Sequence, residues 1–155
     1  MTIRVIFVCL GNICRSPMAE GVFRKLVDDE GLSSYFEIDS AGTSSWHIGE
    51  KAHSGTRSEL AKHGIQYQGR ARQLRQRDVT DKQTYLIAMD KSNINDIRSY
   101  FGVHDRLYRL LDFASQNSAK DVPDPYYNGR FDYVYELVED GCIGLLAKIR
   151  EDEKI

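Results

Sequence analysis

The first strand and the turn after it constrain the fold of this chain more than any other segment. Residues Ile3–Cys9 are mostly β-branched and aromatic, which is typical of a strand covered on both faces. A polar turn follows, and Ser16-Pro17 predicts the N-cap and the first residue of a helix. Apolar residues at helical spacing continue to Gly31, where we expect this helix to end.

The rest of the chain repeats this alternation of strand and helix. Further strands are expected at residues 36–40, 85–89 and 107–110, and further helices at residues 54–62, 92–100 and 131–150. Strands joined by helices form parallel sheets through right-handed crossovers, with helices on both faces. We therefore predict an α/β fold with a four-stranded parallel sheet and a single domain over residues 1–155. Ligands bind such sheets at the carboxyl ends of the strands, so a site is expected at the turn after Cys9.

Composition excludes several classes of protein. The chain has 155 residues, of which 41% are hydrophobic and 28% charged, as in ordinary globular domains. Its net charge of -2 argues against nucleic-acid binding by bulk electrostatics. One local basic cluster is interpreted as a solvated face or loop, with a functional patch as the alternative: Arg70, Arg72, Arg75 and Arg77.

Targeting segments and cysteine pairing give a second set of exclusions. The apolar run at residues 5–10 is too short for a signal peptide, and no stretch approaches the roughly 20 apolar residues that span a bilayer. The 3 cysteines form no CxxC pair, so neither a disulfide scaffold nor a zinc site is indicated. We expect a cytoplasmic protein with free thiols and no membrane partner.

The turn between the first strand and the first helix carries the candidate chemistry. It reads Cys9-Leu10-Gly11-Asn12-Ile13-Cys14-Arg15-Ser16. A cysteine six residues before an arginine is a weak signal by itself. The context is stronger, because the cysteine ends a buried strand and the arginine opens a helix. Between them, Gly11 and Asn12 are the residue types that best tolerate a positive φ.

Such a turn predicts an oxyanion site. Successive backbone N–H groups form an anion-binding nest, and the positive end of the helix dipole faces the same point. Arg15 adds a planar fork that matches two phosphate oxygens. The same field favours a thiolate at Cys9, and Ser16 is expected to donate a hydrogen bond to it while capping the helix.

Two other interpretations of this turn stay open. Cys9 taken alone also fits a small core side chain at the end of a buried strand. A Walker-type nucleotide loop is the other alternative, but the Gly-Lys-Ser/Thr ending with its phosphate-binding lysine is missing.

Residues 8–17, VCLGNICRSP, resemble the phosphate-binding loop of the low-molecular-weight protein tyrosine phosphatases almost letter for letter. The resemblance continues in order along nearly the whole chain, through Asp39-Ser40, Trp46 and Gly49, His63-Gly64-Ile65, Met89-Asp90-Lys91-Ser92-Asn93 and Asp124-Pro125-Tyr126-Tyr127. It implies a three-layer flavodoxin-like fold of four parallel strands. It also implies hydrolysis of phosphotyrosine through a phosphocysteine on Cys9, with Leu10 to Ser16 binding the phosphate.

That reaction needs a general acid, because a tyrosine leaving group has a pKa of about 10. A base must afterwards activate water, and one carboxyl can serve both steps. Asp124 lies between Pro123 and Pro125, which restrict its backbone. Asp-Pro is by itself an ordinary turn opener, and the resemblance implies the acid and base role.

Aromatic residues are expected to form the substrate pocket. Trp46, Tyr126 and Tyr127 suit the walls of a deep slot for an aryl ring, which a phosphoserine would be too short to fill. A Trp46 packed in the interior is the alternative. The 4 histidines show no metal-ligand spacing, so we expect a site without metal or cofactor.

Support for the loop is assigned by the resemblance. It implies that Ser40 and His63 hydrogen-bond Asn12 and hold its strained conformation. Cys14 is either a small buried side chain or a redox partner that traps oxidised Cys9 as a disulfide.

Three other functions are possible on this fold or with this loop. An arsenate reductase on this fold needs further relay cysteines, and none occurs between Cys14 and Cys142. Protein arginine phosphatases carry threonine where this chain has Ile13 and lack the paired tyrosines. A non-catalytic phosphotyrosine-binding module is disfavoured, because Cys9, Arg15 and Asp124 are all present. The expected partners are phosphotyrosine proteins, inhibitory phosphate or vanadate, and a tyrosine kinase acting on the paired tyrosines.

Overall fold

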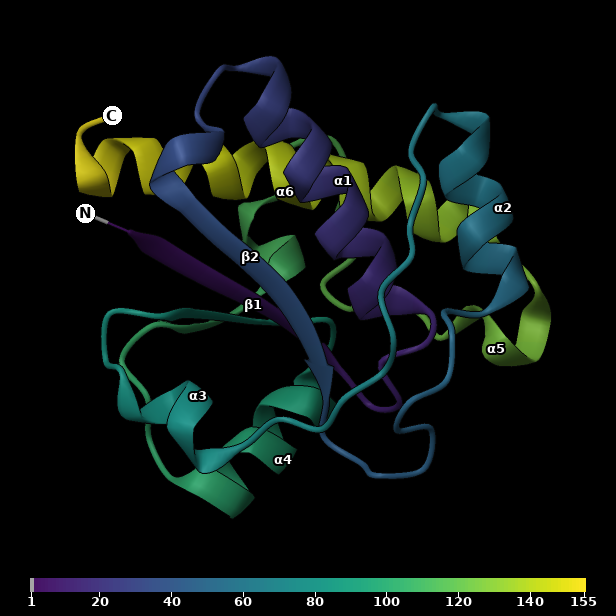
Figure 1. The fold of residues 1–155 in the computed structure, drawn as a ribbon, viewed down its shortest axis with the longest axis horizontal. Helices are drawn as coiled ribbons and strands as arrows, with labels where there is room; N and C mark the ends of the chain where they lie inside the picture. The colour runs from purple at the N-terminus through teal and green to yellow at the C-terminus, as the bar shows by residue number, and fades with distance from the viewer. Residues whose placement is uncertain (1) are drawn as a thin grey trace.

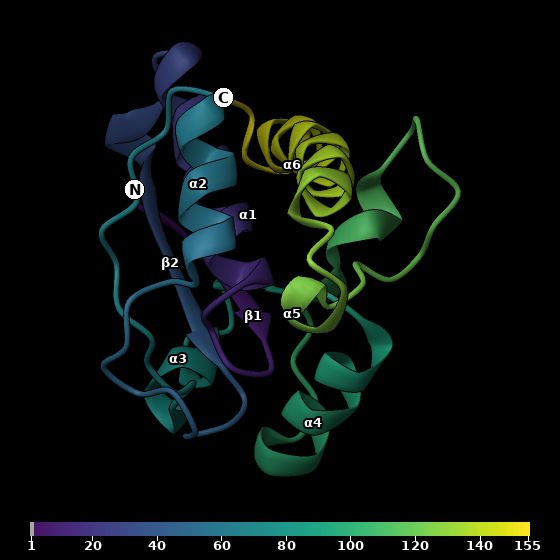
Figure 2. The ribbon, with the colours of Figure 1, turned by 90° about the vertical axis from the view of Figure 1, so that its right-hand side faces the viewer.

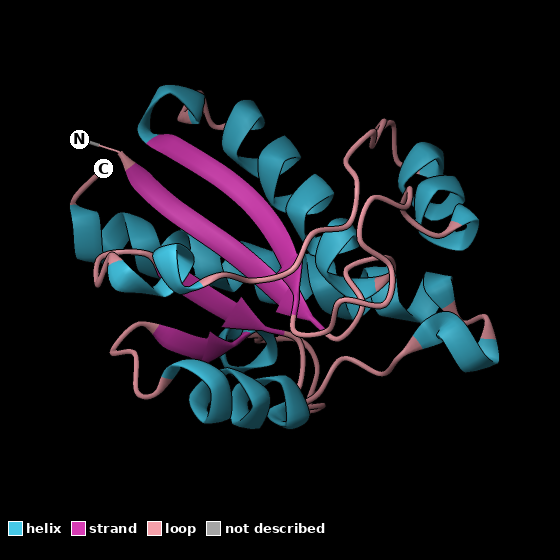
Figure 3. Ribbon diagram, turned by 60° about the horizontal axis from the view of Figure 1, so that its bottom comes forward, coloured by secondary structure: helices cyan, strands magenta, loops and turns pink. Residues whose placement is uncertain are grey.

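The computed structural model of the protein describes residues 2–155. These residues form one sheet of four parallel strands in the order β2-β1-β3-β4 (Figure 3). The strands are β1 (Ile3–Cys9), β2 (Phe36–Gly42), β3 (Tyr85–Ala88) and β4 (Leu107–Arg109). The predicted four-stranded parallel sheet is confirmed.

Helices cover both faces of the sheet, as expected. The helices are α1 (Arg15–Asp29), α2 (Ser54–Lys62), α3 (Gln76–Thr80), α4 (Lys91–Phe101), α5 (Pro125–Asn128) and α6 (Phe131–Glu153), with short 3₁₀ turns at Ser33–Tyr35 and Leu110–Phe113. Figures 1 and 2 show α1, α2 and α6 on one side of the strands and α3 and α4 on the other. The result is the three-layer, flavodoxin-like arrangement.

Alternation along β1 explains why both layers form. Val5 and Phe7 point into the core beneath α1 and α6, whereas Ile6 and Val8 belong to the core on the α4 side. All four of these side chains are fully buried. A strand with apolar residues on both faces can therefore occupy only the interior of a sheet.

The register brings three strand ends to one edge. Cys9 pairs with Gly42 of β2, and Val8 pairs with Ala88 of β3. From β1 the chain passes to β2 on one side of it, and then to β3 on its other side, so the strand order reverses at β1. Ligands bind such folds at the strand ends beside this reversal. A side chain at Gly42 would approach within 2.8 Å of the Leu10 carbonyl oxygen, so the end of β2 lies directly against the loop after Cys9.

Some element boundaries differ from the prediction. Helix α1 begins at Arg15 with Cys14 as its N-cap residue, and no side chain caps it. The Ser16 hydroxyl is engaged elsewhere, with Asn12 and Cys9, so the expected capping role of Ser16 is wrong. The expected strand at residues 107–110 ends at Arg109 and continues as a 3₁₀ turn. Helices α3 and α5 were not anticipated. Within residues 2–155, no helix has the length and hydropathy to cross a bilayer.

Candidate active site

Cys9 lies at the carboxyl end of β1 with its sulfur at the base of a loop of backbone amides. The Asn12 N–H donates to Cys9 Sγ at 3.2 Å, and Ser16 Oγ lies 3.1 Å from the same sulfur. Asn12 Nδ2 already donates to Ser16 Oγ at 2.8 Å, which leaves the Ser16 hydroxyl proton free to point at Cys9. The sulfur therefore has two hydrogen-bond donors available, one from the backbone and one from a side chain.

Asn12 holds the loop in its curved form. Its φ of 59° places it in the left-handed region, which an asparagine tolerates better than most residues. Its amide donates to Ser40 Oγ at 3.0 Å as well as to Ser16, and its side-chain oxygen accepts the Arg72 backbone N–H at 3.0 Å. Three bonds from three segments thus fix one strained residue.

The expected support by Ser40 is present, but that by His63 is wrong. His63 ends α2, where its ring lies 3.1 Å from Glu59 Oε2 and stacks on Tyr135 at a centroid distance of 3.7 Å. Both His63 and Asn12 lie in the described part of the chain, and no hydrogen bond joins them. The chain turns at Gly64, where φ is 76°, and the residue that reaches the loop network is Tyr67.

A buried carboxylate behind the loop was missed by sequence reasoning. Glu20 of α1 is only 6% exposed and accepts from Ser40 Oγ at 2.6 Å and from the Tyr67 hydroxyl at 2.8 Å. Arg24 donates to its other oxygen at 3.0 Å. Burial and the neighbouring Glu20 raise the pKa of Tyr67, so the phenol stays a donor. The position of Glu20, one helical turn after Ser16, was the signal that could have revealed it.

Arg15 projects from the first turn of α1 and is 4% exposed. Its Nη1 donates to Asp90 Oδ2 at 2.5 Å and to the Val122 carbonyl at 3.0 Å. Burial lowers the pKa of Arg15, but the negative charges of Cys9 and Asp90 raise it by more. The guanidinium therefore stays charged with one edge fixed, and its other nitrogens remain available to an anion. Asp90, at the carboxyl end of β3, was not predicted as a site residue.

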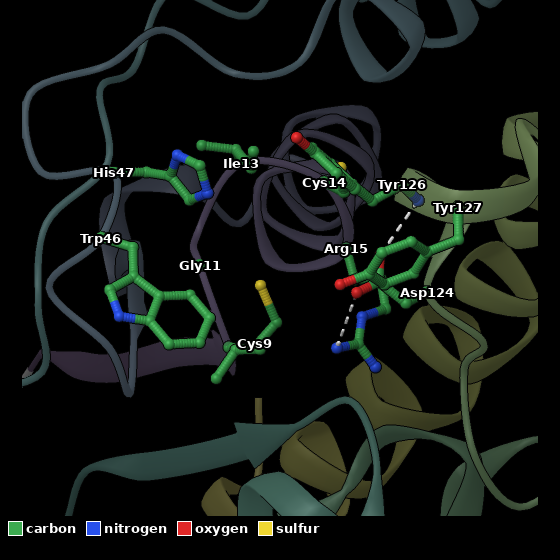
Figure 4. A pocket seen from close by; sticks show the side chains of 11 residues that line it. Cys9, Gly11, Ile13, Cys14, Arg15, Trp46, His47, Asp124, Tyr126 and Tyr127 are labelled. Carbon is green, nitrogen blue, oxygen red and sulfur yellow. Dashed lines mark hydrogen bonds and ion pairs between the residues drawn. The ribbon is translucent and has the colours of Figure 1, made fainter.

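Asp124 lies across the loop from Cys9 (Figure 4). It caps α5, with Oδ1 accepting the Tyr126 N–H at 3.0 Å, which fixes the carboxyl group. Oδ2 lies 3.9 Å from Arg15 Nη2, and the side chain is 30% exposed. A carboxyl group at this place can reach both a bound substrate and water.

These groups surround a pocket of about 190 Å³ above Cys9. It is lined by Cys9, Leu10, Gly11, Ile13, Cys14, Arg15, Trp46, His47, Asp124, Tyr126 and Tyr127. Figure 4 shows Trp46 and His47 on one side of the Cys9 sulfur and the two tyrosines on the other. Trp46 is 72% exposed and Tyr127 is 84% exposed, so the packed alternative for Trp46 is excluded. Aromatic side chains left open at a pocket rim suit a planar ring as ligand.

The second cysteine of the loop is buried beside the first. Burial, and then the charges of Cys9 and Asp124, raise the pKa of Cys14 to about 12. Cys14 is therefore a neutral thiol at pH 7, so it is not the nucleophile. Within residues 2–155, no three His, Cys, Asp or Glu side chains are placed to hold a metal ion.

The chain is similar to known phosphatases along nearly its whole length. The sequence pattern of the low molecular weight phosphotyrosine protein phosphatases matches residues 4–155. The low molecular weight protein-tyrosine-phosphatase YfkJ of Bacillus subtilis is 46% identical over 99% of both chains, and its crystal structure superposes with a TM-score of 0.93 over 98% of this chain and 97% of that one. The phosphatase PtpA of Staphylococcus epidermidis is 41% identical over 99% of this chain and 97% of its own. The Drosophila arginine phosphatase structure is 27% identical, with a TM-score of 0.87 over 96% and 98% of the chains.

Proposed function

Because the chain belongs to the low molecular weight phosphotyrosine protein phosphatase family, and is accordingly a protein-tyrosine-phosphatase, we propose that Cys9 is its nucleophile, Arg15 its phosphate ligand and Asp124 its general acid and base. The single observation that carries this proposal is the convergence of the three side chains on one pocket at the N-terminus of α1. Arg15 Nη2 and Asp124 Oδ2 lie 3.9 Å apart, so the proposed phosphate ligand and the proposed proton donor border the same space.

In the first step the Cys9 thiolate attacks phosphorus and forms an S–P bond. The bond from phosphorus to the tyrosine oxygen breaks, and Asp124 gives its proton to that oxygen. Backbone N–H groups of residues 10–16 and the free edge of Arg15 stabilise the charge on the remaining phosphate oxygens. Because Asp90 and Val122 hold the other edge of Arg15, its orientation needs little reorganisation.

In the second step water attacks the phosphocysteine. Asp124, now a carboxylate, takes a proton from the water, and the S–P bond breaks to release inorganic phosphate. The Ser16 hydroxyl, 3.1 Å from Cys9 Sγ, stabilises the departing thiolate. Inorganic phosphate and vanadate should therefore inhibit by occupying the same cradle.

Phosphotyrosine in proteins is the substrate that the pocket supports best. Trp46 and Tyr127 give an open aromatic rim, which suits an aryl ring above a buried nucleophile. Ile13 lines the pocket, whereas the protein arginine phosphatases, which resemble this chain, carry threonine at that position. The guanidinium of a phosphoarginine would therefore lack a polar partner there. The 3 free cysteines fit the proposed cytoplasmic compartment, and Cys142 is too buried for a redox relay.

Turnover of p-nitrophenyl phosphate in a chelator-containing buffer tests the proposal directly. Wild-type protein should hydrolyse this ester and be inhibited by vanadate. Cys9→Ser should abolish turnover, because a hydroxyl in the same place is a far weaker nucleophile than a thiolate. Cys142→Ser, which removes a thiol from the buried face of α6, serves as the matched control and should retain turnover. Full activity of Cys9→Ser would contradict the proposal.

A further inference from the structure

A second and larger cavity lies between α2 and the segment that follows it, residues 65–70. Its volume is about 460 Å³, more than twice that of the pocket above Cys9. Three cationic side chains line it, Lys51, Arg57 and Arg70, together with Tyr67 and two glutamines. None of its lining residues is acidic, although the whole chain carries a net charge of -2. We refer to this cavity as the basic groove.

The two arginines of the basic groove are held by backbone carbonyls and not by carboxylates. Arg57 Nε donates to the Ala52 carbonyl at 2.9 Å, and Arg70 Nη1 donates to the Gly49 carbonyl at 3.0 Å. Within residues 2–155, Lys51, Arg57 and Arg70 form no ion pair. A guanidinium fixed by a carbonyl keeps its full charge and loses less freedom when it binds an anion.

Their neighbour Arg72 shows the contrast. It also lies in the arginine-rich segment after α2, but its guanidinium pairs with Asp39 at 3.0 Å and with Asp78 at 2.9 Å. Burial lowers the pKa of Arg72, but Asp78 and Asp39 together raise it by more. The charge of Arg72 is therefore used inside the protein, whereas the charge of Arg70 faces the groove.

A short ribbon joins the basic groove to the active site. Lys51 and Arg70 pair across an antiparallel bridge, so their side chains project to the same side. Trp46 and His47, a few residues before Lys51, line the pocket above Cys9. The four residues from His47 to Lys51 span at most about 14 Å when extended, so the edges of the two sites lie within reach of a short peptide.

We propose that the basic groove binds acidic side chains that flank the phosphotyrosine of a protein substrate. This inference rests on the proposed function, because it assumes a phosphotyrosine seated above Cys9. Carboxylates are the groups that arginine forks recognise, and apolar lining is confined to Ala61, Ile65 and the Tyr67 ring. The groove thus adds a preference for sequence context to a pocket that recognises only the phosphorylated ring.

Kinetics with matched phosphotyrosine peptides test this docking role. One pair of peptides carries three glutamates within five residues of the phosphotyrosine, on its N-terminal or C-terminal side. A second pair carries glutamines there, and a third carries the glutamates more than ten residues away. The wild-type protein should show a KM on the order of tenfold lower for one of the near-glutamate peptides, since each exposed ion pair contributes modestly. This preference should weaken as salt is added.

Two triple variants separate the groove from bulk charge. Lys51→Gln/Arg57→Gln/Arg70→Gln should lose the preference while its kcat and KM for p-nitrophenyl phosphate stay unchanged. The control Arg77→Gln/Lys82→Gln/Arg98→Gln removes the same charge from exposed sites of other segments and should keep the preference. Equal KM values for all peptides in the wild type, or equal loss in both triple variants, would overturn the inference. Absence of p-nitrophenyl phosphate turnover in the wild type would instead refute the proposed function.

Discussion

Asn12 offers the sharpest test of how the loop is held. We expect Asn12→Ala to lower both the stability of the protein and its activity. Alanine removes the side-chain bonds to Ser16, Ser40 and the Arg72 backbone, at 2.8, 3.0 and 3.0 Å. It also places a β-carbon without compensating hydrogen bonds at a φ of 59°. The matched variant Asn12→Gly removes the same bonds but tolerates that φ.

The magnitudes follow from these two contributions. Each net hydrogen bond contributes about 1 kcal/mol to the free energy of unfolding, so three contribute about 3 kcal/mol. A left-handed alanine costs about 1 kcal/mol more than a glycine at the same position. We therefore expect losses of about 4 kcal/mol for Asn12→Ala and about 3 kcal/mol for Asn12→Gly. In both variants kcat/KM should fall by up to about 10²-fold, because the amide cradle is displaced from the phosphate.

Urea denaturation followed by circular dichroism measures the first quantity, and p-nitrophenyl phosphate kinetics the second. Equal stability of the alanine and glycine variants would refute the argument from backbone conformation. Losses below about 1 kcal/mol in both variants would refute the argument from hydrogen bonding. Unchanged kcat/KM with lowered stability would show that the loop keeps its shape without Asn12.

Three further predictions concern acids and thiols of this site and its surroundings. Asp124→Asn should lower the kcat for hydrolysis of aryl phosphates with poor leaving groups by about 10²–10⁴-fold, and that of esters with good leaving groups far less. An equal loss of kcat across the series would show that Asp124 is not the general acid. Burial raises the pKa of Asp78, but Arg72, the Arg75 backbone N–H and the charge of Arg4 together lower it by more. The stability that Asp78 contributes is therefore present above about pH 4 and lost as the pH falls through its folded-state pKa. Asp78→Asn should therefore lower the urea midpoint at pH 7 and have a shrinking effect in acid; a constant difference at all pH values would contradict this. Mild peroxide should oxidise Cys9 to a sulfenic acid, which condenses with the Cys14 thiol and releases water; mass mapping that finds a Cys9 sulfonate without a disulfide would count against that pair.

The fold was predictable because its signals are local. A strand such as β1 needs only a run of apolar residues, and α1 needs only helical spacing, so both could be identified from the sequence. Helix α5 could not, because its four residues, Pro125–Asn128, are too few to show a period. Asp124, predicted in an ordinary loop, turns out to cap this helix, which is what fixes its carboxyl group.

The supporting network was predictable only in part, because its contacts cross between segments. The expected bond from Ser40 to Asn12 is present, but the bond expected from His63 is replaced by bonds from Asn12 to Ser16 and to the Arg72 backbone. Sequence shows a polar residue near the end of α2 without showing which way it faces. The His63 ring turns to Glu59 and Tyr135, and it is the Tyr67 hydroxyl, beyond the turn at Gly64, that reaches Glu20 of α1.

The two carboxylates beside Arg15 show how similar groups acquire different roles. Asp90 lies 2.5 Å from one guanidinium nitrogen, is 20% exposed, and caps α4 through its other oxygen. Asp124 lies 3.9 Å from another nitrogen of Arg15 and is 30% exposed. Asp124 likewise accepts a backbone N–H at the start of a helix, through Oδ1, so the two carboxylates differ in their distance from Arg15 and not in capping. The Asp124 Oδ2 atom lies beyond hydrogen-bond distance of Arg15 and the residue lines the pocket, which is why we propose Asp124 as the proton-transferring group and Asp90 as the group that positions Arg15. Distance and exposure carry this assignment, and the sequence displays neither.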